Sequence, residues 1–302
     1  MRFSHLSCAG LSLLAASVLL ASPGCSGKSG GNSVQVVASL HDMTEPFFVA
    51  VKRELDAEAA RLGVSVSVED GQSNSAKQTA DIEAAITGGA QGIILAPNDV
   101  NALTPGVEEV IKAGIPIVTL DRRVDHSSVK VPHVGADNVA GGRIMAQWAI
   151  DSFPNGARVL LITGQLGSSP SIDRTRGIKE GLAAAGAKYQ IVAEQSGNWK
   201  REQGLTVTQN VLTSLGAQSL QAVVAESDEM ALGALEALRS SGAQPTREQM
   251  EGVRKDTNAK ITLLLNDDQK TKFTAWQQER RQHRRGGEGG GEATPPPPPP
   301  SA

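Results

Sequence analysis

Side chains that can bind a polar ligand gather directly after the predicted strands of this chain. They are carboxylates, amides, arginines and aromatic rings, which contact ligands by hydrogen bonding and by stacking. Ligands of open parallel sheets bind outside the carboxyl ends of the strands, so these positions predict a binding crevice. The positions are 42–48, 70–74, 97–99, 121–122, 137–138, 164–174, 198–199 and 227–228.

The same positions hold no motif for a nucleotide, a metal or a catalytic nucleophile. No G-x-G-x-x-G follows the first strand, and the chain has no G-x-x-x-x-G-K-[ST] loop. The five histidines lack metal-ligand spacing, and the residues after Gly164 do not form a G-x-S-x-G elbow. No pair of carboxylates is marked out for glycoside hydrolysis. We therefore expect a binding protein without cofactor or metal, and not an enzyme.

Composition narrows the class further. The chain has 302 residues, with 29 Lys plus Arg against 32 Asp plus Glu and a formal charge of −3. This near-neutral net charge does not indicate nucleic-acid binding. Two cysteines, Cys8 and Cys25, exclude a disulfide scaffold and a zinc ribbon. The length fits one large domain or two medium ones.

Strands alternate with helices along most of the chain, which is typical of parallel sheets with helices on both faces. We predict strands at 34–40, 64–69, 92–96, 115–120, 133–136, 158–163, 189–194 and 220–225. We predict helices at 46–62, 75–88, 101–113, 138–153, 170–185, 201–215 and 228–241. Two such series meet near residues 121–137, so the sequence predicts two lobes.

The first residues form a predicted export segment. A short positive stretch precedes an apolar run at 6–21 that is too short to span a bilayer, as in a secretory signal peptide. A small residue before the lone Cys25 resembles a bacterial lipobox. We therefore expect a signal peptide at 1–24, a lipid on Cys25 and a flexible tether at 25–33. Ordinary cleavage that leaves Cys25 a free thiol is the alternative, since Ser22 stands where the lipobox prefers Leu.

Short motifs at the crevice positions resemble the periplasmic ribose-binding protein family, the type I sugar-binding proteins of ABC transporters. The motifs occur in that family's order and spacing over about residues 34–243. They are Glu45-Pro46-Phe47-Phe48, Thr119-Leu120-Asp121-Arg122, Gly135-Ala136-Asp137-Asn138, Asp173-Arg174-Thr175-Arg176-Gly177 and Ser227-Asp228-Glu229-Met230-Ala231. The resemblance implies an α/β fold of two lobes, with a ligand in the cleft between them.

The resemblance also implies a role for each matching residue. Phe47 and Trp199 would stack on the two faces of a sugar ring, and Phe48 would line the pocket. The other implied residues would bind or border the hydroxyl groups: Glu45, Asp121, Arg122, Asp137, Arg174 and Ser227. Hydrogen bonds to charged partners contribute about 1.5–3 kcal/mol each. Glu45 and Ser227 stand where the family often has amides, which argues against ribose itself and is compatible with a small polyol.

Several of these residues also have an ordinary structural interpretation. Phe47 and Phe48 could belong to the core at the start of a helix. Asp121 and Arg122 could form a surface ion pair, which usually contributes little. Trp199 could serve packing alone. Their joint placement after strands favours the ligand site.

The family pattern ends after about residue 243. We therefore expect an N-terminal lobe at 34–137 and a C-terminal lobe at 138–243 that is incomplete at its end. Apolar residues then recur at helical spacing over 245–285, and 286–302 is rich in Gly and Pro and predicted to be disordered. The abrupt change predicts a fusion with part of another envelope protein. Two segments resemble the motifs of L-T-x-x-Q helical periplasmic chaperones: Thr246-Arg-Glu-Gln249 and Leu265-Asn-Asp-Asp-Gln269.

These observations predict the substrate-binding component of a sugar ABC transporter. It would bind a monosaccharide (a ribose-like pentose, a hexose or a polyol) and would reside in the periplasm or cell envelope. Its expected partners are the sugar, an inner-membrane permease and the membrane through the lipid on Cys25, and we expect a monomer. Two alternatives stay open. One is a sugar-sensing receptor of the same fold. The other is an envelope chaperone or interaction protein that works through the C-terminal helix, with a degraded sugar site.

Overall fold

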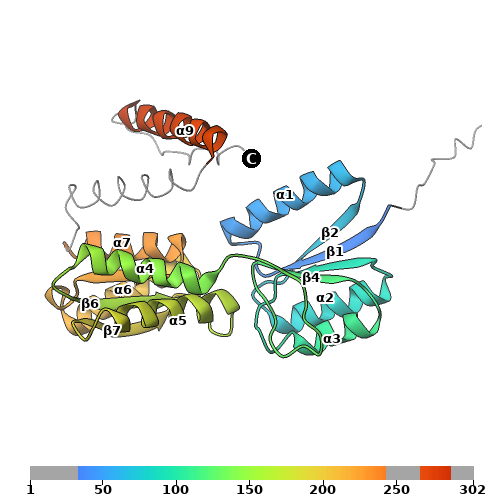
Figure 1. Cartoon of the computed structure of the whole chain (residues 1–302), viewed down its shortest axis with the longest axis horizontal. Helices are drawn as coiled ribbons and strands as arrows, with labels where there is room; N and C mark the ends of the chain where they lie inside the picture. The colour runs from blue at the N-terminus through green and yellow to red at the C-terminus, as the bar shows by residue number, and fades with distance from the viewer. Residues whose placement is uncertain (1–32, 243–265, 287–302) are drawn as a thin grey trace, which may run out of the picture.

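The computed structural model describes residues 33–242 and 266–286, which form two α/β lobes side by side and a further helix (Figure 1). The predicted signal peptide, Cys25 and nearly all of the predicted disordered tail lie outside the described residues, so those predictions stay untested. Within the described part of the chain, no helix is both long enough and apolar enough to cross a membrane.

Lobe one is built on a parallel sheet of five strands in the order β2-β1-β3-β4-β5. The strands are β1 (Gln35–Leu40), β2 (Ser65–Asp70), β3 (Gly92–Leu95), β4 (Ile117–Leu120) and β5 (His133–Val134). Helix α1 (Pro46–Leu62) covers one face, and α2 (Ser75–Thr87) with α3 (Thr104–Lys112) covers the other (Figure 1). The chain leaves β1 toward β2 and later returns to place β3 on its other side. The carboxyl ends of β1 and β3 therefore flank a topological switch point, where α/β sheets bind ligands.

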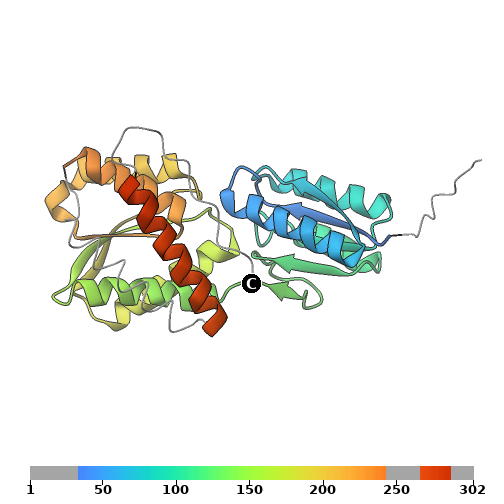
Figure 2. The ribbon, with the colours of Figure 1, turned by 90° about the horizontal axis from the view of Figure 1, so that it is seen from above.

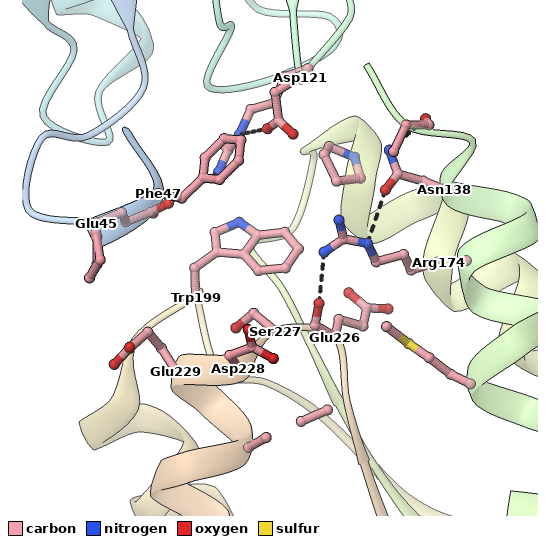
Figure 3. Close-up of a pocket in the computed structure, with 18 of the residues that line it drawn as sticks. Glu45, Phe47, Asp121, Asn138, Arg174, Trp199, Glu226, Ser227, Asp228 and Glu229 are labelled. Carbon is pink, nitrogen blue, oxygen red and sulfur yellow. Dashed lines mark hydrogen bonds and ion pairs between the residues drawn. The ribbon is translucent and has the colours of Figure 1, made fainter. Parts of the chain in front are cut away.

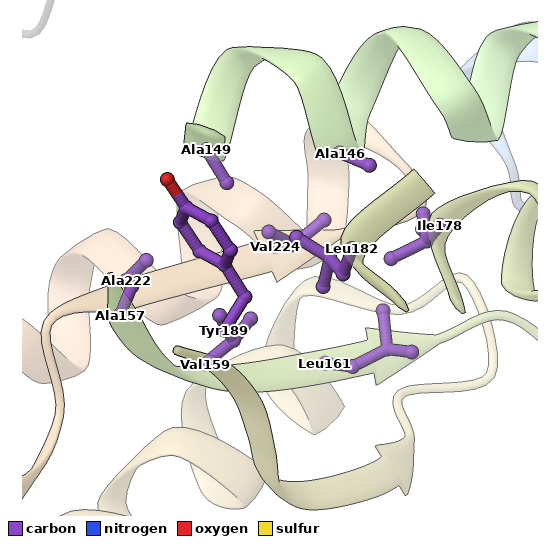
Figure 4. Packing of buried hydrophobic residues seen from close by; sticks show 10 residues of the cluster. All are labelled: Ala146, Ala149, Ala157, Val159, Leu161, Ile178, Leu182, Tyr189, Ala222 and Val224. Atoms are coloured by element: carbon purple, nitrogen blue, oxygen red, sulfur yellow. The ribbon is translucent and has the colours of Figure 1, made fainter. Parts of the chain in front are cut away.

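Lobe two is built on a smaller parallel sheet in the order β7-β6-β8. Its strands are β6 (Ala157–Thr163), β7 (Tyr189–Ser196) and β8 (Ala222–Ala225), and its helices are α4 (Asn138–Ser152), α5 (Ser169–Ala184), α6 (Arg201–Leu215) and α7 (Asp228–Ser240). Alternate side chains of β6 point to opposite faces. Val159 and Leu161 pack with α4 and α5 (Figure 4), whereas Leu160 and Ile162 pack with α6 and α7. The central strand is thus buried on both sides.

Helices α4 and α5 pack almost backbone to backbone. A methyl group added at Gly142 would lie 2.2 Å from the carbonyl oxygen of Arg174, and one added at Gly177 would lie 2.1 Å from that of Val139. Neither position can hold a larger residue without moving a helix. This close approach fixes where α5 presents Arg174 at the end of the sheet.

The predicted elements are present, and their bounds differ by a few residues. Helix α3 begins at Thr104 instead of 101, because Asp99 Oδ1 accepts the N–H groups of Asn101 (2.8 Å) and Ala102 (2.9 Å) and holds them in a turn. Strand β8 begins at Ala222 instead of 220, because a 3-10 helix at Ala217–Ser219 comes first. Strand β5 ends at Val134, because the chain leaves the sheet there for lobe two.

Part of the predicted C-terminal helix is described as α9 (Asp267–Gly286). It lies beside lobe two, on the side of α4 and α7, in both views (Figures 1 and 2). Phe273 and Trp276 stack on one another, with ring centroids 5.8 Å apart. The rest of that prediction, residues 245–265, lies outside the described residues.

Candidate functional site

A cavity of about 730 Å³ lies between the two lobes, and all nine residues predicted for the ligand site border it (Figure 3). They come from both lobes and from six separate segments of the chain. The nine are Glu45, Phe47, Phe48, Asp121, Arg122, Asp137, Arg174, Trp199 and Ser227. Their common placement is a structural fact, whereas contact with a ligand stays a prediction.

The first wall of the cavity comes from the start of α1. Pro46 opens the helix, and Phe47 and Phe48 follow it in the first turn. Phe48 is buried against Leu40 and Ala96, whereas Phe47 is 53% exposed and meets Phe48 edge to face at 5.1 Å. Phe48 is therefore both core and lining, and Phe47 presents a free aromatic face.

Arg122 lies at the bottom of this wall and is only 2% exposed. Its guanidinium carbon lies 5.7 Å from the Phe48 ring and 5.8 Å from the Trp199 ring. Carboxylate oxygens of Asp121 and Glu45 lie 3.9 Å and 4.0 Å from its nitrogens. The interpretation of Asp121 and Arg122 as an ordinary surface pair is therefore wrong.

Arg122 keeps spare hydrogen-bonding capacity. One terminal nitrogen donates to Gln165 Oε1 (3.2 Å), but its buried Nε donates no hydrogen bond within the described residues. Burial lowers the pKa of Arg122 to about 10, and the charges of Glu45 and Asp121 oppose that shift. The side chain is therefore still a cation at neutral pH.

Asp121 occupies a strained backbone position at the end of β4. Its φ of 61° is in the left-handed region, which costs energy for a residue with a side chain. Its N–H donates to the Val134 carbonyl (2.7 Å), which holds it there. Burial raises the pKa of Asp121, and Arg122 and Arg174 oppose that rise. Strained and partly desolvated carboxylates of this kind are concentrated at functional sites.

Arg174 supplies the second cation, from α5 in lobe two. Its Nε donates to Asn138 Oδ1 (2.9 Å), and a terminal nitrogen donates to the Glu226 carbonyl (2.7 Å), as the dashed lines in Figure 3 show. Its guanidinium carbon lies 5.7 Å from the Trp199 ring. Two neutral acceptors therefore fix the direction in which this arginine points.

Trp199 forms the second aromatic wall. It follows β7 in a loop where Asn198 and Trp199 have φ values of 48° and 63°, two successive left-handed residues. Its ring lies against Gly164, where an added methyl group would come within 2.0 Å of it. Trp199 is 7% exposed and belongs to the core of lobe two, so it packs and borders the cavity at once.

Glu45, Asp137 and Ser227 also have structural partners. Glu45 Oε1 lies 3.2 Å from Nε2 of the buried His41, whose pKa is lowered by burial. Asp137 accepts the Ala140 N–H (2.9 Å) and caps α4. Ser227 accepts the Met230 N–H (3.4 Å) and caps α7. The cap positions hold these two side chains at the cavity edge.

Asn138 and Glu226 also line the cavity, but the sequence-based prediction gave neither a role in the site, although Asn138 lies within the predicted crevice position 137–138. Asn138 fixes Arg174, and Glu226 supplies the carbonyl that does the same. The Glu226 carboxylate is 1% exposed and accepts from the Gly164 N–H and the Thr175 hydroxyl (2.7 Å and 2.5 Å). Burial raises its pKa, and those two hydrogen bonds oppose the rise. The signal was present, since both residues adjoin predicted site residues after strands.

His41, Asp42 and Glu45 place ligand atoms within 4.8 Å of one another, a spacing that could hold a metal ion. The Asp42 oxygens already accept hydrogen bonds from Thr44 and Ser73 and from the Lys200 ammonium (2.9 Å). A cation is thus already supplied by the protein, and we interpret this cluster as a contact between the lobes.

Comparison with known proteins agrees with this geometry. A model of the periplasmic binding protein domain matches residues 36–285, which extends past the end of the resemblance at about 243. The ribose import binding protein of Bacillus subtilis is 39% identical over 204 residues, which cover 68% of this chain and 65% of that protein. The chain therefore spans slightly less than two thirds of that relative. The Escherichia coli counterpart is 34% identical over 77% of this chain and 76% of its own length.

Solved structures give the same picture. The crystal structure of the Caulobacter myo-inositol binding protein with myo-inositol is 48% identical, with a TM-score of 0.69 over 70% of this chain and 72% of that one. A galactofuranose binding protein superposes with a TM-score of 0.67 at 26% identity over 70% of this chain and 73% of that one. The partial coverage agrees with a fold that is incomplete at its C-terminal end. The chaperone-like motifs have no support in these comparisons.

Proposed function

The chain belongs to the periplasmic binding protein family, and on that premise we propose that it is the sugar-binding component of an ABC transporter. Its ligand is an uncharged ring rich in hydroxyl groups, either a monosaccharide or a cyclic polyol, held between the two lobes. The family consists of solute-binding proteins, and we propose no catalysed reaction. The chaperone alternative is not favoured, because the family match covers both lobes.

One observation carries this proposal: aromatic faces and charged hydrogen-bonding groups from both lobes border the same cavity. A sugar ring has apolar C–H faces and a polar rim. Phe47 and Trp199 offer surfaces for the faces. Arg122 and Arg174 offer donors for the rim, and Asp121 offers acceptors. Hydroxyl groups both donate and accept hydrogen bonds. They therefore match a cavity border that holds both cations and carboxylates better than a charged ligand does.

Relatives narrow the choice of ligand. The proteins similar to this chain include binders of ribose, of D-ribose and D-allose, of galactofuranose and of xylitol. The structure that is 48% identical holds myo-inositol. Ser227 contributes a small hydroxyl and Glu45 a carboxylate at the cavity border, and both suit a ring that carries hydroxyls on every carbon. We therefore place myo-inositol first among the candidate ligands.

Family membership implies a periplasmic location. We propose further that Cys25 carries a lipid that anchors the protein to a membrane, that the protein is a monomer, and that its ligand-bound form docks on an inner-membrane permease. Mass spectrometry of the protein purified from membranes tests the anchor. A diacylglyceryl mass on a peptide that begins at Cys25 supports it, and a free thiol there contradicts it.

Isothermal titration calorimetry of the purified chain with myo-inositol, ribose, xylose, allose and galactose tests the ligand class. We expect saturable heat with at least one of them, and a higher midpoint of thermal unfolding with the same compound. Replacing Arg122 with Met should abolish the heat. The matched control is Arg53→Met, which removes an exposed arginine of α1 that pairs with Glu54 outside the cavity. No heat with any compound, from a sample that melts cooperatively, contradicts the proposal.

A further inference from the structure

The loop that carries Trp199 holds an unfavourable backbone shape. Asn198 and Trp199 are two successive residues in the left-handed region, which costs about 1–3 kcal/mol for each non-glycine residue. Within the loop, the Asn198 N–H donates to Ser196 Oγ (3.2 Å) and the Lys200 N–H donates to the Gly197 carbonyl (2.8 Å). Such strain persists only where surrounding contacts hold it.

Trp199 packs in the core of lobe two, and the next residue, Lys200, contacts the other lobe. The Lys200 side chain leaves lobe two, and its ammonium donates to Asp42 Oδ2 (2.9 Å) and to the Thr44 hydroxyl (2.7 Å), both just after β1. The Lys200 side chain is 28% exposed and that of Asp42 is 8% exposed, so salt screens this pair less than it screens a surface pair.

Asp42 is prepared for this partner by its own lobe. Its Oδ1 accepts from the Thr44 N–H (2.8 Å) and hydroxyl (2.6 Å), and its Oδ2 accepts from the Ser73 hydroxyl (2.6 Å). Burial alone would raise the pKa of Asp42, but the hydrogen bonds from Ser73, Thr44 and Lys200 hold it well below its ordinary range. The carboxylate is therefore ionised at neutral pH, and hydrogen bonds from its own lobe fix its direction.

Other contacts between the lobes use different loops. Arg123 of lobe one pairs with Asp173, and its N–H donates to Ser169 Oγ (2.9 Å). Gln165 donates to Asn98 Oδ1 (2.7 Å). These join the loops after β3 and β4 to the segment after β6. The loop that carries Trp199 contacts lobe one at two neighbouring residues: the Trp199 ring lies 5.8 Å from the Arg122 guanidinium carbon, and Lys200 pairs with Asp42.

We propose that Lys200 and Asp42 are positioning residues for ligand binding. Their ion pair holds the Trp199 loop against lobe one, and it sets the lobe spacing at which Trp199 and Phe47 face a ligand from two sides. The effect on affinity rests on the proposed function, whereas the effect on lobe spacing is a property of the protein without ligand.

Spin labels measure the spacing directly. Ala57 on α1 and Gln209 on α6 are exposed, and both become cysteines in the full chain with Cys8 and Cys25 replaced by serine. Double electron–electron resonance without ligand should give a narrow distance distribution. We expect it to broaden in Lys200→Met and Asp42→Asn, and to stay narrow in Lys200→Arg, which keeps the charge. Added salt should broaden the distribution of the parent protein and leave Lys200→Met unchanged.

The matched control is Lys179→Met, which removes a lysine that pairs with Glu194 inside lobe two (2.8 Å). It should leave the distribution narrow. Because only the fraction with the correct spacing binds, we expect the Kd for the ligand found by calorimetry to rise about tenfold in Lys200→Met. Lys200→Arg should keep a Kd near that of the parent protein.

The two proposals fail in different ways. If the parent protein binds no compound of the panel, the proposed function fails, and the spin-label distances still decide whether the ion pair sets the spacing. If Lys200→Met and Asp42→Asn keep the narrow distribution, the positioning role is refuted, whatever the ligand. An equal loss of affinity in Lys179→Met would likewise refute it.

Discussion

Arg122 in lobe one and Arg174 in lobe two border the same cavity, but their surroundings hold them in different ways. Arg122 is almost fully buried, between two aromatic rings and beside the carboxylates of Asp121 and Glu45. Arg174 donates instead to two neutral acceptors, Asn138 Oδ1 and a backbone carbonyl. One arginine is held mainly by charge and the other mainly by directed hydrogen bonds.

The same residue type therefore performs two tasks: Arg122 balances buried charge, and Arg174 is held in a fixed orientation. The charges around Arg122 make it hard to remove, because buried carboxylates would be left without a cation. Its Nε is buried and donates no hydrogen bond within the described residues. The acceptors around Arg174 fix its orientation, and they are less sensitive to its loss because they carry no net charge.

Arg122→Met should lower the free energy of unfolding by about 3–5 kcal/mol, as expected when one partner of a buried charge cluster is removed. Urea denaturation measures the change. Adding Glu45→Gln removes one of the stranded carboxylates, so the double variant should regain part of the loss. Equal stability of the single and double variants would contradict our view of Arg122 as a residue held by charge.

Arg174→Met should lower the free energy of unfolding by about 1–3 kcal/mol, because a buried carbonyl and an amide oxygen lose their donor. The ligand identified by calorimetry should bind at least tenfold more weakly, through loss of a charged hydrogen bond. Urea denaturation measures the loss of stability, and calorimetry measures the loss of affinity. A loss of stability as large as that of Arg122→Met would remove the distinction between the two arginines.

Asn138→Ala should lower the free energy of unfolding by about 1 kcal/mol, the usual net contribution of one hydrogen bond. Asn138→Asp keeps an acceptor for Arg174 and should lose less. The affinity for the ligand should fall in Asn138→Ala, because Arg174 is then free to turn. If alanine and aspartate behave alike, the orientation of Arg174 does not depend on this acceptor.

Glu226 in lobe two and Asp42 in lobe one should change the free energy of unfolding with pH in opposite directions. Burial raises the pKa of Glu226 above its ordinary 4.5, so its ionised form costs stability, and that cost is relieved as pH falls toward 4.5. Hydrogen bonds lower the pKa of Asp42 below its ordinary 3.8, so its contribution is present above 3.8 and is lost only at lower pH.

Denaturation from about pH 7 to about pH 5 tests this difference. The stability of the parent protein relative to Glu226→Gln should increase over that range, and its stability relative to Asp42→Asn should stay constant. Below about pH 4, the advantage over Asp42→Asn should decrease. If the stability of the parent protein relative to Glu226→Gln and relative to Asp42→Asn changed with pH in the same way, the stated directions of the two pKa shifts would be wrong.

Much of the fold follows from local pattern. Apolar periodicity, helix stop signals and the alternation of strands and helices place nearly every element within a few residues. The common placement of the nine residues around one cavity was predictable as well, because parallel strands bring their carboxyl ends to one edge. Their contact with a ligand stays a prediction. The errors arise where contacts between distant segments decide. Glu226 and Asn138 matter through Arg174, and no spacing in the sequence reveals which acceptor an arginine reaches.

Other differences between the sequence-based predictions and the structure have local causes that composition does not reveal. Asp137 and Ser227 sit at helix N-termini, so their side chains serve as caps as well as cavity border. The Asp99 side chain turns the chain before α3 and delays that helix. The ion pair of Lys200 with Asp42 joins residues from separate lobes, so it requires the three-dimensional arrangement.

Within the described residues, the chain passes from lobe one to lobe two once, between β5 and α4. The described part of each lobe is therefore encoded by one uninterrupted stretch of the gene. Exchange of the segment before or after codons 135–137 would replace the described part of one lobe, and with it one half of the cavity. The contacts across the cleft, such as Lys200 with Asp42, would then be the traits that decide which halves are compatible.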